Sequence, residues 1–118
     1  MILIDTSVWV AHLRQGNIGL EKMLTEGRVL SHPFIVSELA CGNLQHRAGI
    51  LTDLATLPQA ILASHGEVLQ FIETNRLMGR GLGYVDVHLL ASARLSGAFL
   101  WTLDKKLQEA AANLRLAT

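Results

Sequence analysis

Short apolar runs that alternate with helix-forming segments are the feature that most constrains the fold of this chain. The runs lie at Ile2–Ile4, Arg28–Ser31, Ala60–Leu62 and Ala98–Thr102, and each is typical of a short buried strand. The patterns around them predict helices over Thr6–Arg14, Ile18–Glu26, Pro33–Leu44, Ala48–Leu57, His65–Met78, Tyr84–Leu95 and Lys105–Asn113. This alternation predicts an α/β fold with a parallel sheet and helices on both of its faces.

Length and composition favour a single folded domain. The chain has 118 residues, half of them hydrophobic, which suits one domain over residues 1–118 with a sizeable core. Ten basic and ten acidic residues give a formal net charge of zero, which argues against a protein that holds nucleic acid mainly through bulk positive charge. A nuclease stays open, because its phosphate contacts can be local.

The sequence also favours the cytoplasm. Its single cysteine, Cys41, excludes an internal disulfide framework and a cysteine zinc cluster, and it fits a reducing compartment. The sequence shows no signal peptide and no apolar run long enough to span a membrane. We therefore expect a cytoplasmic protein without a membrane partner, in which Cys41 is a small core residue.

Three of the four aspartates lie at or near the ends of predicted elements. Asp5 follows the strand Ile2–Ile4, Asp104 follows the strand Ala98–Thr102, and Asp86 opens the apolar helix after a glycine-rich loop. The carboxyl ends of parallel strands meet at one edge of a sheet. We therefore expect these carboxylates at a common rim.

Glu38 is the fourth candidate. It is the only charged residue between His32 and Gln45, and an unpaired charge is costly to bury. Three solutions are open: Glu38 faces water, it pairs with an arginine, or it shares a cation with other carboxylates.

Each acid also has a purely structural explanation. Asp104 suits a helix N-cap, Asp86 suits the first turn of a helix, Asp5 can cap the helix that begins near Ser7, and Glu38 can be a solvated edge residue. The four together are harder to explain this way, because carboxylates on one rim repel one another unless a cation neutralises them. Hard oxygen ligands favour Mg²⁺ or Mn²⁺.

Four blocks of sequence surround these acids. They are Ile4-Asp5-Thr6-Ser7-Val8-Trp9, His32-Pro33-Phe34 with Ser37-Glu38-Leu39-Ala40, the segment from Gly83 to Ala93, and the segment from Leu100 to Leu107. In this order and spacing they closely resemble the PIN-domain ribonucleases, and in particular the VapC toxins of bacterial type II toxin–antitoxin pairs. The resemblance covers essentially the whole chain.

The resemblance implies a three-layer PIN-like fold and a metal-dependent endoribonuclease that hydrolyses RNA phosphodiester bonds. It implies that Asp5, Glu38, Asp86 and Asp104 form the catalytic set, with Asp5, Asp86 and Asp104 as metal ligands. Because Mg²⁺ keeps several waters, we expect direct contacts from Asp5 and Asp86 and support through water from Glu38 and Asp104. A cognate VapB-like antitoxin and a homodimer are further implications.

The hydroxyl and cationic side chains near the acids each allow a functional and a structural interpretation. Thr6, Ser7 and Thr102 can orient a carboxylate or a water, or they can make ordinary caps and turns. An acidic pocket needs local cations to receive RNA. The candidates are Arg14, Arg47, Arg80, Lys105 and Lys106, and each can also be an ordinary solvated surface charge.

The helices Ile18–Leu24 and Ala48–Leu57 are candidate walls of an antitoxin groove. None of the five histidines has a partner at ligand spacing, so a structural role is expected for each.

Three other functions compete with the ribonuclease. A receiver-type phospho-acceptor domain needs two adjacent acids after the first strand, whereas Ile4 and Thr6 flank Asp5. A catalytically inert PIN-fold binding module would not need to keep all four acids. A DNA-directed or structure-specific nuclease on this fold would be expected to carry an arch insert or a basic extension, and the sequence has neither.

Overall fold

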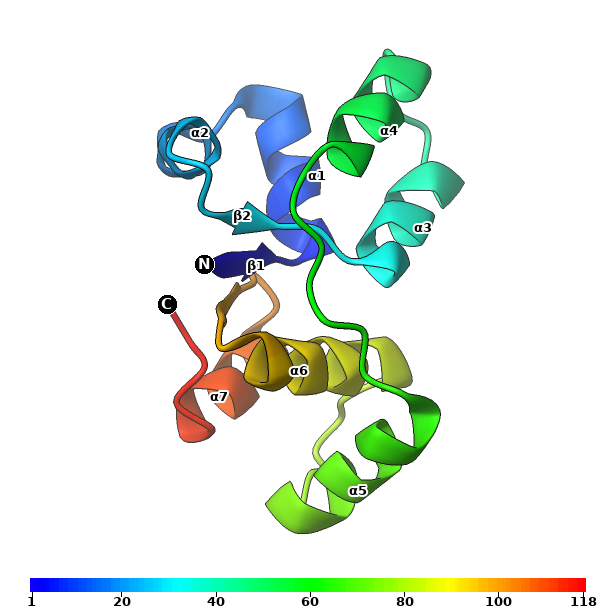
Figure 1. Cartoon of the computed structure of the whole chain (residues 1–118), viewed down its shortest axis with the longest axis vertical. Helices are drawn as coiled ribbons and strands as arrows, with labels where there is room; N and C mark the ends of the chain where they lie inside the picture. Colours follow the sequence, from blue (N-terminus) through cyan, green and yellow to red (C-terminus); the bar gives the residue numbers. More distant parts are fainter.

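A small parallel sheet lies between two groups of helices in the computed structural model, which describes all 118 residues (Figure 1). The elements are β1 (Ile2–Ile4), α1 (Thr6–Gln15), α2 (Ile18–Thr25), β2 (Val29–Leu30), α3 (Pro33–Cys41), α4 (Arg47–Ala55), α5 (His65–Asn75), α6 (Tyr84–Ser96), β3 (Phe99–Trp101) and α7 (Lys105–Asn113). The strand order is β2-β1-β3, with parallel pairing throughout. The predicted α/β class is confirmed.

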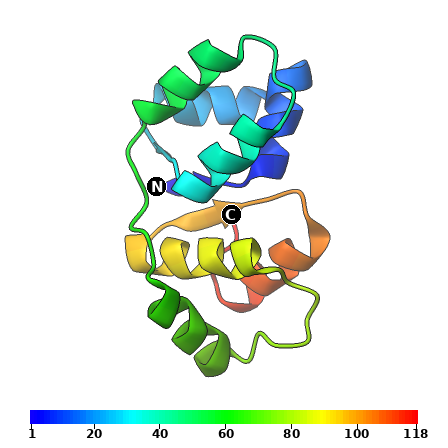
Figure 2. The same cartoon turned by 90° about the vertical axis from the view of Figure 1, so that its right-hand side faces the viewer.

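The layers are seen most clearly after a quarter turn (Figure 2). Helices α1 to α4 lie on one side of the sheet, and α5 to α7 lie on the other. The central strand β1 is buried at all three residues, because each of its edges is paired and each of its faces is covered. Helix α6 is buried without a break from Val87 to Ala93. None of the helices combines the length and the apolar character that crossing a membrane would need.

The predicted strand Ala60–Leu62 is wrong. Only one isolated bridge, between Ser31 and Gln59, joins this segment to the sheet. The backbone N–H groups of Ile61 and Ala63 donate instead to the hydroxyls of Ser96 and Ser92 in α6, at 2.8 and 3.2 Å. Because α6 serines satisfy these groups, the segment crosses the sheet as an extended connection from α4 to α5 (Figure 1).

Two burial expectations also fail. The strand over Ala98–Thr102 is shorter than predicted and is not buried on both faces, since Phe99 is 51% exposed. Helix α3 ends at Cys41, with Gly42 as its C-cap, rather than at Leu44. Cys41 is exposed and free, because it lies in the last turn of α3 beyond the residues that pack on the core. The expectation of a core cysteine is therefore wrong.

The glycine-rich loop before α6 requires a glycine at position 81. Gly81 has φ +75°, and a Cβ placed there would lie 2.8 Å from Nζ and 3.0 Å from Cδ of Lys106. We expect Gly81→Ala to lower the free energy of unfolding by about 1 kcal/mol, because alanine is strained at positive φ. Urea unfolding measures this.

Gly66 in α5 is the matched control for that substitution. A Cβ added to Gly66 would meet no atom within 4 Å, and its φ is ordinary, so Gly66→Ala should leave stability unchanged or raise it by about 0.5 kcal/mol. Equal effects of the two substitutions on the urea midpoint would contradict this account of the loop.

Candidate functional site

Asp5 and Thr102 meet where two neighbouring strands end. Asp5 directly follows β1, and Thr102 directly follows β3. The strands pair in register through Ile4 and Trp101, and the Asp5 backbone N–H donates to the Trp101 carbonyl at 2.9 Å. Two side chains 97 residues apart in the chain are therefore placed at the same edge of the sheet.

Two hydroxyls hold the Asp5 carboxylate in place. Ser7 Oγ and Thr102 Oγ1 each donate to Asp5 Oδ2 at 2.7 Å, and Asp5 is only 8% exposed. The same hydroxyls accept from the backbone beyond β3: Thr102 Oγ1 from Asp104 N, and Ser7 Oγ from Leu103 N, both at 3.0 Å. The segment that carries Asp104 is thus tied to Asp5.

Asp86 and Asp104 each make a helix-terminal hydrogen bond. Asp104 is the N-cap of α7, and its Oδ1 accepts from Leu107 N at 2.9 Å. Asp86 lies in the first turn of α6, and its Oδ2 accepts from Gly83 N at 3.1 Å. These bonds are the structural roles that the sequence had left open, and each occupies only one carboxylate oxygen.

Glu38 joins the same region through Thr6. It is exposed on α3, and its Oε1 accepts from Thr6 Oγ1 at 2.7 Å. Thr6 is the residue after Asp5, so the contact places α3 beside the edge of the sheet that carries Asp5. No arginine neutralises Glu38, because the one ion pair of the protein joins Arg28 to Glu26 at 4.0 Å.

Asp86 shows that three of the acids form one negatively charged region. Burial raises the pKa of Asp86 above its ordinary value, and the hydrogen bond from Gly83 opposes this effect. The negative charges of Asp104 and Asp5 raise the pKa further. Asp86 therefore experiences the other two aspartates across the site, although the three belong to three different segments.

The four acids are not packed as a ready-made coordination shell. No three His, Cys, Asp or Glu side chains lie close enough together for that. Hydrogen bonds to Gly83 and Leu107 draw Asp86 and Asp104 toward their own helix ends, and mutual repulsion favours this separation.

The donor set nevertheless fits a hydrated Mg²⁺ or Mn²⁺ ion. No protein hydrogen bond engages Oδ1 of Asp5, Oδ1 of Asp86, Oδ2 of Asp104 or Oε2 of Glu38. Mg²⁺ keeps several waters and takes only one or two carboxylates directly, so free carboxylate oxygens that are not packed together suit it better than they suit a close four-ligand metal.

Comparison with known protein families decides where this chain belongs. The model of the PIN domain matches residues 2–113, which is nearly the full length. The chain belongs to the PIN domain family. This PIN domain is 45% identical over 118 residues to Ribonuclease VapC32 of Mycobacterium tuberculosis, in two strains, a match that covers 99% of this chain and 95% of that protein.

A solved structure shows the same fold. The crystal structure of PAE2754 from Pyrobaculum aerophilum superposes with a TM-score of 0.61 and covers 92% of this chain and 78% of that chain. The sequences are 19% identical, so this likeness supports the fold alone. The predicted resemblance to PIN domains and the predicted fold class are both confirmed.

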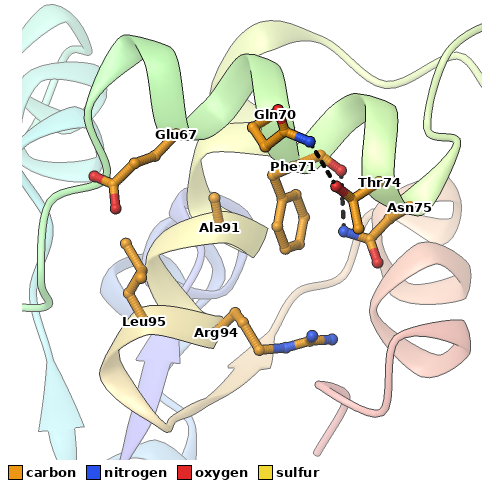
Figure 3. A pocket seen from close by; sticks show the side chains of 8 residues that line it. All are labelled: Glu67, Gln70, Phe71, Thr74, Asn75, Ala91, Arg94 and Leu95. Atoms are coloured by element: carbon orange, nitrogen blue, oxygen red, sulfur yellow. Dashed lines mark hydrogen bonds between the residues drawn. The ribbon is translucent and has the colours of Figure 1, made fainter.

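None of the four acids lines a surface hollow of this PIN domain. One of about 330 Å³ lies between α5 and α6, where Phe71 and Arg94 face each other (Figure 3). Two more, of about 190 and 470 Å³, share Leu13 of α1 and Ile50 of α4. The two hollows are lined mainly by α1, by α4 and by the segment between α3 and α4, with Leu24 of α2 at the first. The antitoxin surface predicted on Ile18–Leu24 and Ala48–Leu57 stays a prediction.

Sequence reasoning missed a buried histidine pair beside the site. His32 and His88 are 0% and 3% exposed, and their ring centroids lie 5.1 Å apart. The backbone N–H of Phe34 donates to His32 Nδ1 at 3.1 Å, so His32 is also the N-cap of α3. The two histidines are far apart in the chain and carry no spacing signal, and only the apolar neighbours of each one pointed to burial.

Proposed function

We propose that this PIN domain is a metal-dependent endoribonuclease and the toxin of a cytoplasmic toxin–antitoxin pair. The observation that carries the proposal is the Asp5 carboxylate, which Ser7 and Thr102 hold at the shared end of β1 and β3 beside the segment of Asp104. No protein cation neutralises these acids within 4.0 Å. The 45% identity to a protein named Ribonuclease VapC32 supports RNA as the substrate. Mg²⁺ or Mn²⁺ is the ion that the oxygen ligands favour.

The four acids have distinct roles in this proposal. Asp5 and Asp86 would hold the ion directly, because both are partly or fully buried and both keep a free oxygen. Glu38 and Asp104 are exposed, and they would position water molecules next to the ion. A bound ion of this kind lowers the pKa of a coordinated water and offsets charge on phosphate oxygens. Ser7 and Thr102 orient Asp5 for this task.

Induction in a bacterial host tests the proposal. The wild-type chain should arrest growth and produce new RNA 5′ ends at discrete positions, whereas Asp5→Ala should do neither at equal expression. Sequencing the 5′ ends also identifies the RNA that is cut. Growth without arrest and without new ends would favour the inert PIN-fold module instead.

Metal removal gives the matching test on the purified chain. Cleavage of the mapped RNA should stop in EDTA and return with Mg²⁺ or Mn²⁺. The ion should also raise the thermal midpoint in the absence of RNA, because it binds the folded chain alone. Cleavage that persists in EDTA would contradict the proposed chemistry.

Thr102→Val tests the positioning of Asp5. The valine keeps the shape but removes the donor to Asp5 Oδ2 and the acceptor for Asp104 N. We expect about tenfold slower RNA cleavage, since partners of metal ligands commonly contribute that much, and a loss of about 1–2 kcal/mol in the free energy of unfolding. Thr52→Val is the control, because Thr52 is exposed on α4 and its hydroxyl donates only to the backbone carbonyl of Ala48. Equal losses of activity in the two variants would refute a positioning role for Thr102.

The groove between α1 and α4 is the proposed antitoxin surface. Apolar residues line one of its two hollows, among them Trp9, Leu13 and Leu54, with Leu24 of α2, and an amphipathic helix suits a groove of this kind. The antitoxin of a VapC-type toxin is expected to be VapB-like, and the toxin itself is expected to be a homodimer. Light scattering of the purified chain, with and without the co-expressed antitoxin, measures both assemblies.

A further inference from the structure

The side chain of Lys106 lies against a loop, while its charge has no partner in the protein. Lys106 is exposed in the first turn of α7, and it contacts the glycine-rich loop before α6 (Figure 2). A Cβ placed on Gly81 would lie 2.8 Å from its Nζ, 3.0 Å from its Cδ and 3.3 Å from its Cε. Three successive atoms of the side chain therefore lie along the loop backbone.

The two ends of this side chain lie in the segments that hold two of the acids. At the α7 end, Asp104 Oδ1 accepts from the backbone N–H of Leu107, the residue directly after Lys106. In the loop, two residues beyond the contact with the lysine, Gly83 donates its backbone N–H to Asp86 Oδ2. The negative charge of Asp104 raises the pKa of Asp86, so the two segments that the lysine connects also interact electrostatically.

The positive charge of Lys106 is not neutralised by these acids. It has no ion-pair partner within 4.0 Å, because the one ion pair of the protein joins Arg28 to Glu26. The influence that lowers the pKa of Asp86 is a hydrogen bond from Gly83 and not a cation. The N–H donors of the lysine ammonium are therefore free for an acceptor outside the chain.

RNA needs such a cation at this rim. A single divalent ion leaves part of the charge of four carboxylates uncompensated, and the formal net charge of the whole chain is zero. Proteins hold the backbone of nucleic acids mainly by placing lysine and arginine against its phosphates. A lysine stem that already rests on a loop loses less conformational freedom on binding than a free one does.

We propose that Lys106 is a substrate-binding residue whose ammonium binds one backbone phosphate of the RNA where α7 meets the loop before α6. The inference rests on the proposed ribonuclease function and adds to it a residue and the group of the substrate that this residue contacts. A phosphate contact carries no base information, so Lys106 should act on all cleaved sequences alike.

Three substitutions separate this contact from general electrostatics. Lys106→Met keeps an unbranched stem for the contact with Gly81 and removes the charge, and Lys106→Arg keeps a cation. Lys105→Met removes the same charge one residue earlier, where the side chain is equally exposed but points about 100° away around the helix. Values of kcat and KM for the mapped RNA are measured at several KCl concentrations under saturating Mg²⁺, and thermal midpoints check the fold of each variant.

The expected result is a loss of RNA binding with an altered salt dependence. Lys106→Met should lower kcat/KM about five- to tenfold, mainly through a higher KM. The plot of log kcat/KM against log salt concentration should become shallower by about 0.7, the value for one phosphate contact of a single strand. Lys106→Arg should recover most of the loss, and Lys105→Met should stay within about twofold of the wild type.

Mg²⁺ titration distinguishes substrate binding from a disturbed metal site. The Mg²⁺ concentration that gives half-maximal activity should not rise in Lys106→Met, because removing a positive charge beside carboxylates cannot weaken their attraction for a divalent ion. A clear rise would mean that Lys106 acts by positioning the acids, and would overturn the proposed phosphate contact.

A scan with neutral phosphates identifies the bound group. Each substrate carries one methylphosphonate beside the cut on a 2′-deoxy sugar, and its control carries the same sugar with an ordinary phosphate. For the wild type, one position should lower kcat/KM about five- to tenfold. Lys106→Met should lose nothing further at that position, because the partner of that phosphate is already gone.

Three results would overturn the phosphate contact. The first is a wild type indifferent to every methylphosphonate, a measurement that needs no variant. The second is an unchanged salt dependence in Lys106→Met, and the third is an equal loss in Lys105→Met and Lys106→Met. Cleavage by the wild type alongside any of these results leaves the proposed ribonuclease function in place. If the wild type cleaves no RNA at all, the proposed function fails and the phosphate contact fails with it.

Discussion

Asp5→Asn is expected to lower the single-turnover rate of RNA cleavage by about 10³-fold or more. The asparagine keeps the size of the side chain and an oxygen for the Ser7 and Thr102 hydroxyls, but it removes the negative charge that would hold a divalent ion. An ion of this kind contributes several kcal/mol to such a reaction, and each 1.36 kcal/mol is a factor of about ten in rate. The measurement is cleavage of the mapped RNA with enzyme in excess.

Asp53→Asn is the matched control. Asp53 is the one aspartate outside the candidate site. It is exposed on α4, and its substitution should leave the cleavage rate unchanged. The proposed division of roles predicts that Asp86→Asn falls as far as Asp5→Asn and that Glu38→Gln falls less. Full metal-dependent activity in Asp86→Asn would exclude Asp86 as a direct ligand, and comparable activity of Asp5→Asn and Asp53→Asn would exclude a role for the Asp5 charge.

Local sequence rules predicted the elements that carry the acids. The strands Ile2–Ile4 and Phe99–Trp101 are short apolar runs, and helix α7 begins and ends where its N-cap aspartate and apolar pattern place it. The carboxyl ends of parallel strands meet at one edge of a sheet, which is why the sequence predicts Asp5 at the same rim as Asp104, with Thr102 nearby. The 2.7 Å hydrogen bond between Thr102 and Asp5 is a consequence of that topology.

Sequence rules failed where a distant partner decides the outcome. The segment around Ala60 has a strand-like composition, but the serines of α6 take its N–H groups, and no local pattern encodes that choice. Cysteine is a residue type that is usually buried, yet Cys41 is exposed because it lies in the last turn of α3, where the helix leaves the core. The contact between His32 and His88 needs α3 and α6 in place at once.

The His32–His88 pair predicts a stability that falls in mild acid. Burial, with a smaller contribution from the neighbouring His88, lowers the pKa of His32 from 6.5 to about 4, and burial also lowers the pKa of His88. The geometry gives the reason for His32: Nδ1 accepts from Phe34 N, and Nε2 lies 3.1 Å from the Ser92 hydroxyl. A proton on Nδ1 would remove the cap of α3 and place a charge in the core.

The sign follows from the two protonation steps. The unfolded chain takes up a proton on this histidine near pH 6.5, and the folded chain does so only near pH 4. Protons in this window therefore favour the unfolded state. The contribution to stability is complete above about pH 7 and is lost as the pH falls from 6.5 toward 4. Between about pH 7.5 and pH 5 we expect a loss of about 1–2 kcal/mol from His32, allowing for solvent screening.

Paired asparagine substitutions isolate this contribution. His32→Asn keeps a side chain that can cap α3 but cannot titrate, whereas His46→Asn replaces an exposed histidine at a left-handed position that asparagine tolerates. Urea midpoints at the two pH values should show a strong pH dependence in the wild type and in His46→Asn, and a much weaker one in His32→Asn. An undiminished pH dependence in His32→Asn would mean that other groups carry the acid sensitivity, His88 among them, because burial lowers its pKa too.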